Sequence, residues 1–291
     1  MIEPLLADDA FLADVADARR RGGMHLWWLG QSGFLVAHEN SCALLDPYLS
    51  DSLTHKYAGS DKPHERMTRR VIDPRRLDFI SVVTSSHHHT DHLDADTIRP
   101  LMQANPDLRL IVPEASRDFV AQRLNVATAL PIGMDDETTV RVADFTFTGV
   151  PAAHETVERD AAGRCKFLGY VIRAGPWTIY HSGDTVLYDG MIDRLRQFEI
   201  DIALLPINGR APERRVAGNL SAPEAAQLAH AIRARVVVPC HHEMFEFNTA
   251  SPDPFIAECK RLGQRYQVLR AGQRISLSLI HISEPTRQAE I

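Results

Sequence analysis

The 291-residue sequence has few cysteines, and none of them lie close together in the chain. Cys42, Cys165, Cys240 and Cys259 are scattered, without a CxxC pair. Such spacing predicts neither a disulfide framework nor a thiolate metal site. We therefore expect a protein of a reducing compartment.

The sequence also lacks a basic excess and long hydrophobic runs. Its 32 basic and 38 acidic residues give a net charge of -6, which opposes non-specific binding to nucleic acid or to an anionic membrane. No apolar run reaches the roughly 20 residues that a membrane span needs. The first 20 residues have neither the basic nor the apolar region of a signal peptide. We expect a cytoplasmic protein without a nucleic-acid or membrane partner; a homo-oligomer is compatible with the sequence.

What the sequence does contain is an alternation of strand and helix patterns. Helical spacing over 4–21 ends at a Gly-Gly pair, and short apolar runs over 25–30, 32–39 and 41–47 predict a meander of strands. Further strands are predicted over 77–83, 108–113, 138–152, 167–175, 177–183, 200–207 and 235–242, with helices over 94–106, 114–125, 188–197 and 221–234. Ser221 and Glu224 have the spacing of a capping box at the last of these helices. The alternation is typical of an α/β domain with two sheet layers.

No linker rich in Pro, Gly or Ser divides the chain, so we expect one domain over 1–277. Residues 278–291, LIHISEPTRQAEI after Ser278, do not continue the preceding pattern. They are interpreted either as a non-native extension or as a disordered tail.

The stretch SSHHHTDHLD, residues 85–94, follows the predicted strand over 77–83 directly. Its side chains His87, His89, Asp91 and His92 have the spacing H-x-H-x-D-H. On a loop that leaves a strand, this spacing allows alternate imidazoles to bind one metal ion and the Asp-His pair to bind a second. The ordered mixture of His and Asp favours a metal site over a solvated polar loop.

Later strand ends supply further candidate ligands. His154, Asp184 and the pair His241–His242 each follow an apolar run, where loops gather at one edge of a sheet. Either histidine of the pair can be the last ligand; we prefer His241 and interpret His242 either as a residue that packs beside the ligands or as one that faces the substrate.

In this order, the candidates resemble the motif series of the metallo-β-lactamase superfamily: HxHxDH, a His, a bridging Asp and a last His. The similarity spans roughly residues 24–270. Within the superfamily, the stretches at 27–36, 180–185, 200–209 and 237–248 are similar to the L-ascorbate-6-phosphate lactonase group.

The resemblance implies an αββα four-layer sandwich, with two mixed sheets flanked by helices and the active site at one edge of both sheets. It also implies two divalent metal ions. One would be held by His87, His89 and His154, the other by Asp91, His92 and His241, with Asp184 bridging them. The His-rich set points to zinc and the lactonase group to manganese, and the sequence leaves this choice open.

Two divalent ions can bring the pKa of a bridging water from about 16 to roughly 7. We therefore predict a hydrolase in which Asp91 moves a proton of the water and His242 protonates the leaving group. The resemblance implies that its substrate is a small anionic lactone, such as that of a phosphorylated sugar. Asn208, at a predicted strand end, and Asn248, at the same edge, are predicted to contact the substrate. Arg210 is predicted to do so as well, because arginine binds phosphate and carboxylate well; a solvated basic loop is the alternative interpretation. The alternatives are a phosphodiesterase or nuclease on the same fold and a non-catalytic metal-binding protein.

Overall fold

The computed structural model describes residues 1–210, 214 and 218–277. The predicted tail over 278–291 lies outside these residues. Two mixed sheets form the centre of the described fold. The seven-stranded sheet has the order β13-β1-β2-β3-β4-β5-β6 and the six-stranded sheet the order β12-β11-β10-β9-β8-β7.

The strands of the first sheet are β1 (Met24–Gly30), β2 (Gly33–His38), β3 (Ser41–Leu45), β4 (Val82–Thr84), β5 (Arg109–Pro113), β6 (Ile132–Met134) and β13 (Arg274–Leu277). Those of the second are β7 (Thr139–Val142), β8 (Phe145–Pro151), β9 (Leu168–Ala174), β10 (Trp177–His181), β11 (Ile202–Pro206) and β12 (Val236–Cys240). The α-helices are α1 (Asp8–Arg21), α2 (Ser52–Lys56), α3 (Ala95–Ala104), α4 (Arg117–Leu124), α5 (Met191–Leu195), α6 (Ala222–Ala231) and α7 (Asp253–Leu262).

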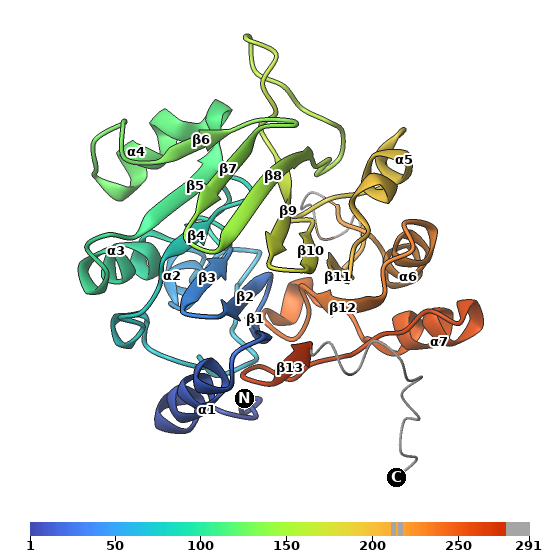
Figure 1. The fold of residues 1–291 in the computed structure, drawn as a ribbon, viewed down its shortest axis with the longest axis horizontal. Coiled ribbons are helices and arrows are strands. Elements are labelled where there is room, and N and C mark those ends of the chain that lie inside the picture. Colours follow the sequence, from blue (N-terminus) through green and yellow to red (C-terminus); the bar gives the residue numbers. More distant parts are fainter. Residues whose placement is uncertain (211–213, 215–217, 278–291) are drawn as a thin grey trace.

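Three layers of apolar side chains hold these elements together. One cluster packs α1, α3 and α4 against the first sheet, a second fills the space between the sheets, and a third packs α5, α6 and α7 against the second sheet. Figure 1 shows α3 and α4 beyond β4 and β5 on one side of the molecule, and α6 and α7 beyond β12 on the other. The predicted αββα sandwich is confirmed.

The alternation of side chains along β1 connects two of these layers. Trp27 packs with the helices that cover the first sheet, while Trp28 lies between the sheets, and both indoles are buried. Successive residues of a strand point to opposite faces, so a strand that is covered on both sides is apolar throughout.

The structure corrects some of the predicted element bounds. The strand predicted over 77–83 is confined to β4, because parallel pairing with β3 begins at Val82. Ahead of it, the side chain of Asn105 binds the backbone of Leu77 and Ile80 and takes the place of a strand partner. The sequence patterns also did not predict β6, β13, α2 or α7, which are short or follow weak periodicity.

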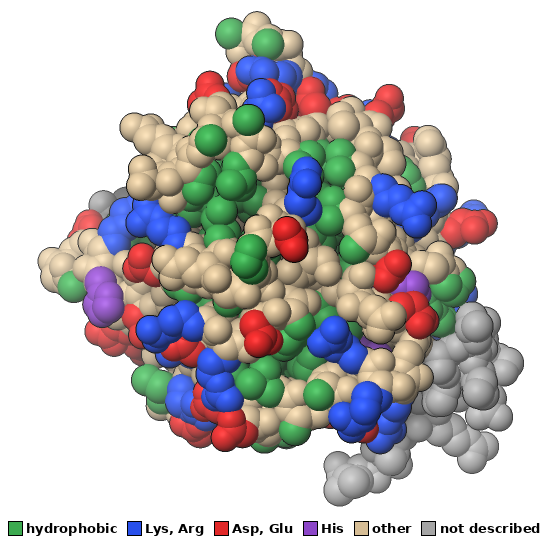
Figure 2. Space-filling view, turned by 60° about the vertical axis from the view of Figure 1, so that its left-hand side comes forward, with side chains coloured by type: hydrophobic (Ala, Val, Ile, Leu, Met, Phe, Trp, Pro, Cys, Tyr) green, Lys and Arg blue, Asp and Glu red, His purple; other side chains and the backbone are tan. Residues whose placement is uncertain are grey.

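The surface carries charges of both signs. On the face shown in Figure 2, Lys and Arg side chains are interspersed with Asp and Glu. Among the described helices, none has both the length and the apolar character needed to span a membrane.

Candidate metal centre

The candidate ligands all follow the carboxyl ends of strands at one edge of the two sheets. The loop over 85–92 follows β4, His154 follows β8, Asp184 follows β10 and His241 follows β12. In the second sheet β10 and β12 are both parallel to β11, and β8 regains their direction through two antiparallel steps across β9. Their carboxyl ends therefore lie at the same edge.

Contacts between the sheets fix the histidine loop at this edge. Tyr170 of β9 donates its hydroxyl to the carbonyl of Ser85 at 2.9 Å, and the Leu168 amide donates to the carbonyl of Ser86 at 3.0 Å. Gly183, with φ of 59°, approaches the Ser86 side chain so closely that an added Cβ would lie 2.5 Å from the Ser86 Cβ. The turn before Asp184 therefore requires glycine.

The structure brings the seven candidate ligands into two adjoining groups. In each group one ligand atom per residue lies within 4.8 Å of the others: His87, His89 and His154 form one group, and Asp91, His92, Asp184 and His241 form the other. Asp184 connects them, since its Oδ2 is 3.6 Å from His154 Nε2 and 3.4 Å from His241 Nε2.

Hydrogen bonds orient the imidazoles toward the centre. His92 Nδ1 donates to Asp46 Oδ2 at 2.6 Å, and His154 Nδ1 donates to the carbonyl of Gly218 at 3.0 Å. An imidazole that donates from Nδ1 presents the lone pair of Nε2, which is how metal-binding histidines are usually held. Asp46 is fully buried and also accepts hydrogen bonds from the Ser86 amide and hydroxyl.

The polar atoms that face the centre fit a cation. Among the described residues, His87 Nε2, His92 Nε2 and Asp184 Oδ1 are buried without a hydrogen-bond partner. A buried polar atom without a partner is costly, and a coordinated cation would satisfy all three. Nitrogen and carboxylate donors without thiolate suit zinc, manganese or iron.

The protonation states of the candidate ligands also fit a bound cation. Burial raises the pKa of Asp184, but His92 and His241 outweigh it, so the pKa of this carboxyl lies well below its usual range. Burial lowers the pKa of His89 to about 4 and leaves its imidazole neutral. For His241 burial lowers the pKa, but Asp184 and Asp91 outweigh it and raise the pKa to about 9. A cation beside His241 would therefore take the place of a proton.

A cavity of about 490 Å³ opens over this centre. His89, Asp91, His154, Asp184 and His241 line it together with residues from other elements: Leu53, Lys56, Tyr57, Lys62, His64, His88, Thr90, Arg123, Asn219, Phe247 and Asn248. The strand-end side chains are thus accessible to a small molecule.

The structure separates the two neighbouring histidines at the end of β12. The backbone of His241 has φ of 60°, in the left-handed region, so the two rings point in different directions. His241 lines the cavity, whereas His242 is buried and stacks on Trp28 with ring centroids 4.5 Å apart. This packing gives no support to the predicted role of His242 as a proton donor to the substrate.

The three residues that were predicted to contact the substrate differ in their position relative to the cavity. Asn248 lines the cavity. Asn208 is buried and donates its side-chain amide to Asn248 Oδ1 at 3.0 Å, so it positions Asn248. Arg210 forms an ion pair with Glu224 at the start of α6 and is not among the residues that line the cavity, so its contact with a substrate stays a prediction.

Several residues at the site were not predicted from the sequence. Asp46 ends an apolar strand pattern as the other ligands do, and that signal could have identified it. Gln31, which donates to Asp91 Oδ2 at 2.8 Å, directly follows β1 and has the same signal. His64, Lys56 and Arg123 have no such signal, because none of them follows a central strand.

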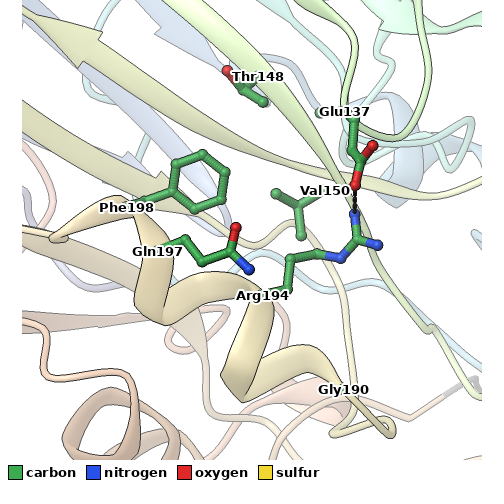
Figure 3. Close-up of a pocket in the computed structure, with 8 residues that line it drawn as sticks. Glu137, Thr148, Val150, Gly190, Arg194, Gln197 and Phe198 are labelled. Carbon is green, nitrogen blue, oxygen red and sulfur yellow. Dashed lines mark ion pairs between the residues drawn. The ribbon is translucent and has the colours of Figure 1, made fainter.

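A second cavity, of about 390 Å³, lies elsewhere, between β8 and the segment over 190–198. Figure 3 shows Arg194 beside Glu137, with the guanidinium 3.6 Å from the carboxylate, and Phe198 and Val150 opposite. Arg194 also pairs with Asp136, so its charge is neutralised. The residues lining this cavity include no histidine or cysteine.

The fold and the site define a class: an α/β protein with two packed mixed sheets and a histidine–aspartate centre at their common edge. Residues 43–242 match the family model described as a beta-lactamase superfamily domain. The chain belongs to the metallo-β-lactamase superfamily.

Individual relatives agree with this assignment. The chain is 28% identical over 260 residues to a UPF0173 metal-dependent hydrolase of Opitutus terrae, covering 87% of this chain and 100% of the relative. It is 25% identical over 261 residues to the probable L-ascorbate-6-phosphate lactonase UlaG of Escherichia coli, covering 79% and 73%. The metallo-β-lactamase fold protein YhfI from Bacillus subtilis superimposes with a TM-score of 0.61 at 19% identity, covering 87% and 98%, which shows a shared fold.

Proposed function

We propose that this protein is a metal-dependent hydrolase that opens a small anionic lactone. The observation that carries the proposal is the two ligand groups joined through Asp184, five of whose seven residues line one cavity: His89, Asp91, His154, Asp184 and His241. The similarity to proteins named as metal-dependent hydrolases and as a probable lactonase supports the same class.

The residues fit divalent cations, with His87, His89 and His154 holding one, Asp91, His92 and His241 a second, and Asp184 shared. When bound, such ions lower the pKa of water and polarise a carbonyl or phosphoryl oxygen. Zinc and manganese both suit this set of ligands.

Two side chains of the cavity wall can handle water and substrate directly. Asp91 accepts a hydrogen bond from Gln31 at one oxygen, which fixes its carboxylate and leaves the other oxygen able to accept a proton from water. Asn248 Oδ1 accepts from Asn208 at 3.0 Å and from Arg214 at 2.7 Å. Because its oxygen is occupied, Asn248 offers its amide N–H groups to a substrate oxygen.

The charge of the cavity wall favours an anionic substrate. Lys56, Lys62 and Arg123 line it, against Asp91 and Asp184 within the centre itself. Arg123 donates to the carbonyls of His88 and Leu93 at 2.6 and 3.2 Å, so it both holds the histidine loop and adds positive charge. With cations bound to the carboxylates, the remaining field attracts anions.

The cavity's size and the interspersed surface charges in Figure 2 fit a small molecule better than a polynucleotide. The same site could also hydrolyse a small phosphodiester. The test therefore includes a phosphodiester substrate.

The test measures metal content and turnover together. Purified protein is stripped with a chelator, reloaded with zinc or with manganese, and assayed on δ-valerolactone, D-glucono-δ-lactone 6-phosphate and bis(p-nitrophenyl) phosphate. We expect turnover of the phosphorylated lactone only after reloading, and Asp184→Ala to lower it at least about a hundredfold. The exposed Asp189→Ala is the matched control and should retain activity.

Turnover of the phosphodiester alone would replace the lactonase proposal by a phosphodiesterase. Stoichiometric metal without turnover of any of the three would favour a non-catalytic metal-binding protein. Failure to bind either metal would refute the proposal.

A further inference from the structure

One short segment supplies several side chains of the cavity wall. Helix α2, which Figure 1 labels beside β3, and the loop that follows it contribute Lys56, Tyr57, Lys62 and His64. These side chains do not belong to either ligand group. They therefore form a wall that can contact a substrate without holding a metal.

Packing on three sides fixes the ring of His64. Tyr57 stacks on it with ring centroids 4.3 Å apart, and Phe247 and Phe245 meet it edge to face at 4.5 and 5.0 Å. Phe245 belongs to a small apolar cluster with Tyr48, Leu53 and Met244, and Tyr57 and Phe247 pack against that cluster. Thr54 also donates its hydroxyl to the His64 carbonyl at 2.6 Å. A side chain held in this way keeps one orientation, as a substrate-contacting group requires.

One hydrogen bond determines which nitrogen of His64 carries the proton. Nδ1 lies 2.9 Å from the carbonyl oxygen of Lys62. A carbonyl only accepts, so Nδ1 is the N–H and Nε2 holds the lone pair. Burial, the largest influence, lowers the pKa of His64, while the Lys62 carbonyl and Asp91 oppose it and Lys56 and Lys62 add to it.

The second nitrogen remains available. Among the described residues His64 Nε2 has no hydrogen-bond partner, and it is not one of the fully buried unpartnered atoms. His64 is half-buried and lines the cavity, which leaves Nε2 as the ring nitrogen able to accept a hydrogen bond from a bound molecule. It is an acceptor in a wall whose other polar members, Lys56 and Lys62, are cationic donors.

We propose that His64 is a specificity-determining residue whose Nε2 accepts a hydrogen bond from a hydroxyl group of the substrate, while the substrate's anionic group lies toward Lys56. The substrate class is thus a hydroxylated anion, such as a phosphorylated or carboxylated sugar derivative. The inference deepens the proposed hydrolase function and rests on it.

The test distinguishes the contribution of the acceptor nitrogen of His64 from that of its aromatic ring. His64→Phe keeps an aromatic ring between Tyr57 and Phe247 and removes the acceptor; His64→Gln restores an acceptor oxygen. His55→Gln, at an exposed histidine of α2, is the matched control. Each variant is loaded with metal, its metal content is measured, and kcat and KM are determined on D-glucono-δ-lactone 6-phosphate and on δ-valerolactone, which has no hydroxyl substituent.

We expect His64→Phe to lower kcat/KM for the phosphorylated lactone about tenfold, the effect of one lost hydrogen bond, chiefly through KM. δ-Valerolactone should change less than about twofold, and His64→Gln should recover most of the loss. Unchanged kinetics, or an equal loss on both lactones, would overturn the proposal.

A binding measurement distinguishes this inference from the proposed function. If metal-loaded wild-type protein opens neither lactone, the lactonase proposal fails, and calorimetric titration with 6-phosphogluconate decides the role of His64. Weaker binding by His64→Phe, with recovery in His64→Gln, supports the role. No binding by the wild type, or equal binding by all variants, refutes it.

Discussion

At the scale of single residues, Asp46 has the greatest influence on the centre without belonging to the seven predicted ligands. Its carboxylate accepts from His92 Nδ1 and from both the amide and the hydroxyl of Ser86, and so fixes the tautomer of one ligand and the start of the histidine loop. Its backbone has φ of 40°, which a non-glycine residue adopts only when the surroundings stabilise it. Such residues are frequent at functional sites.

Replacing Asp46 should weaken metal binding without removing a ligand. Asp46→Asn replaces one carboxylate oxygen by an NH2 group, so either His92 Nδ1 or the Ser86 amide loses its acceptor, and affinity for zinc should fall about 10- to 100-fold. Equilibrium dialysis with metal analysis measures this. Asp144→Asn, which alters an exposed carboxylate bound to Ser41, is the control and should bind as the wild type. Unchanged affinity in folded Asp46→Asn would contradict the orienting role.

At the scale of elements, the strands determine where the ligands lie and the helices hold the strands. Helix α6 packs on β11 and β12, the strand before His241, through Ala225, Ala226 and Leu228. Its first turn has the predicted capping box: Ser221 Oγ accepts from the Glu224 amide, and Glu224 Oε2 accepts from the Ser221 amide at 2.8 Å. Arg210 pairs with the same glutamate, which is why it does not reach the cavity.

The capping box is expected to increase the free energy of unfolding. Ser221→Ala removes an acceptor for the first turn of α6 and should lower the free energy of unfolding by about 1 kcal/mol. Urea denaturation followed by circular dichroism measures the change. Gln227→Ala, an exposed substitution in the middle of the same helix, should stay within about 0.5 kcal/mol of the wild type. Equal effects of the two substitutions would mean that the cap contributes nothing specific.

At the scale of the whole molecule, the centre joins the two sheets. The histidine loop follows β4 of the first sheet, whereas His154, Asp184 and His241 follow strands of the second. A cation bound to both would connect the two halves of the sandwich and bind the native state alone. Metal binding and global stability are therefore expected to be coupled.

Removing metal should lower the thermal stability of the protein. A free metal concentration a hundred times the dissociation constant stabilises the native state by about 2.7 kcal/mol, so a chelator should lower the unfolding midpoint by several degrees. Differential scanning calorimetry with and without chelator measures the shift. Asp184→Ala, which lacks the shared ligand, should show a much smaller shift. A shift as large as that of the wild type would argue against metal binding at this centre.

The patterns of the sequence were sufficient to predict the two-layered α/β fold and to select the residues that meet at the sheet edge. Both depend on local information: apolar periodicity defines the strands, and a polar residue directly after a strand must lie at the strand's end. The bounds of the strand predicted over 77–83 and the position of Arg210 could not be predicted from local information. The strand over 77–83 was overestimated because an apolar run does not reveal where its partner strand begins, and Arg210 could not be assigned to Glu224 or to the cavity from its neighbours alone.

Only the tertiary structure decided which of His241 and His242 faces the centre, because a single left-handed backbone conformation turns one ring into the cavity and the other against Trp28. It also brought Asp46, Gln31 and His64 to the site from segments far away in the chain. Their roles depend on packing between the sheets and on the aromatic cluster around His64. Asp46 and Gln31 each follow an apolar strand, but the sequence does not show that their side chains turn toward the ligands. His64 follows no central strand, and its contacts leave no periodic pattern from which its place at the cavity could be predicted.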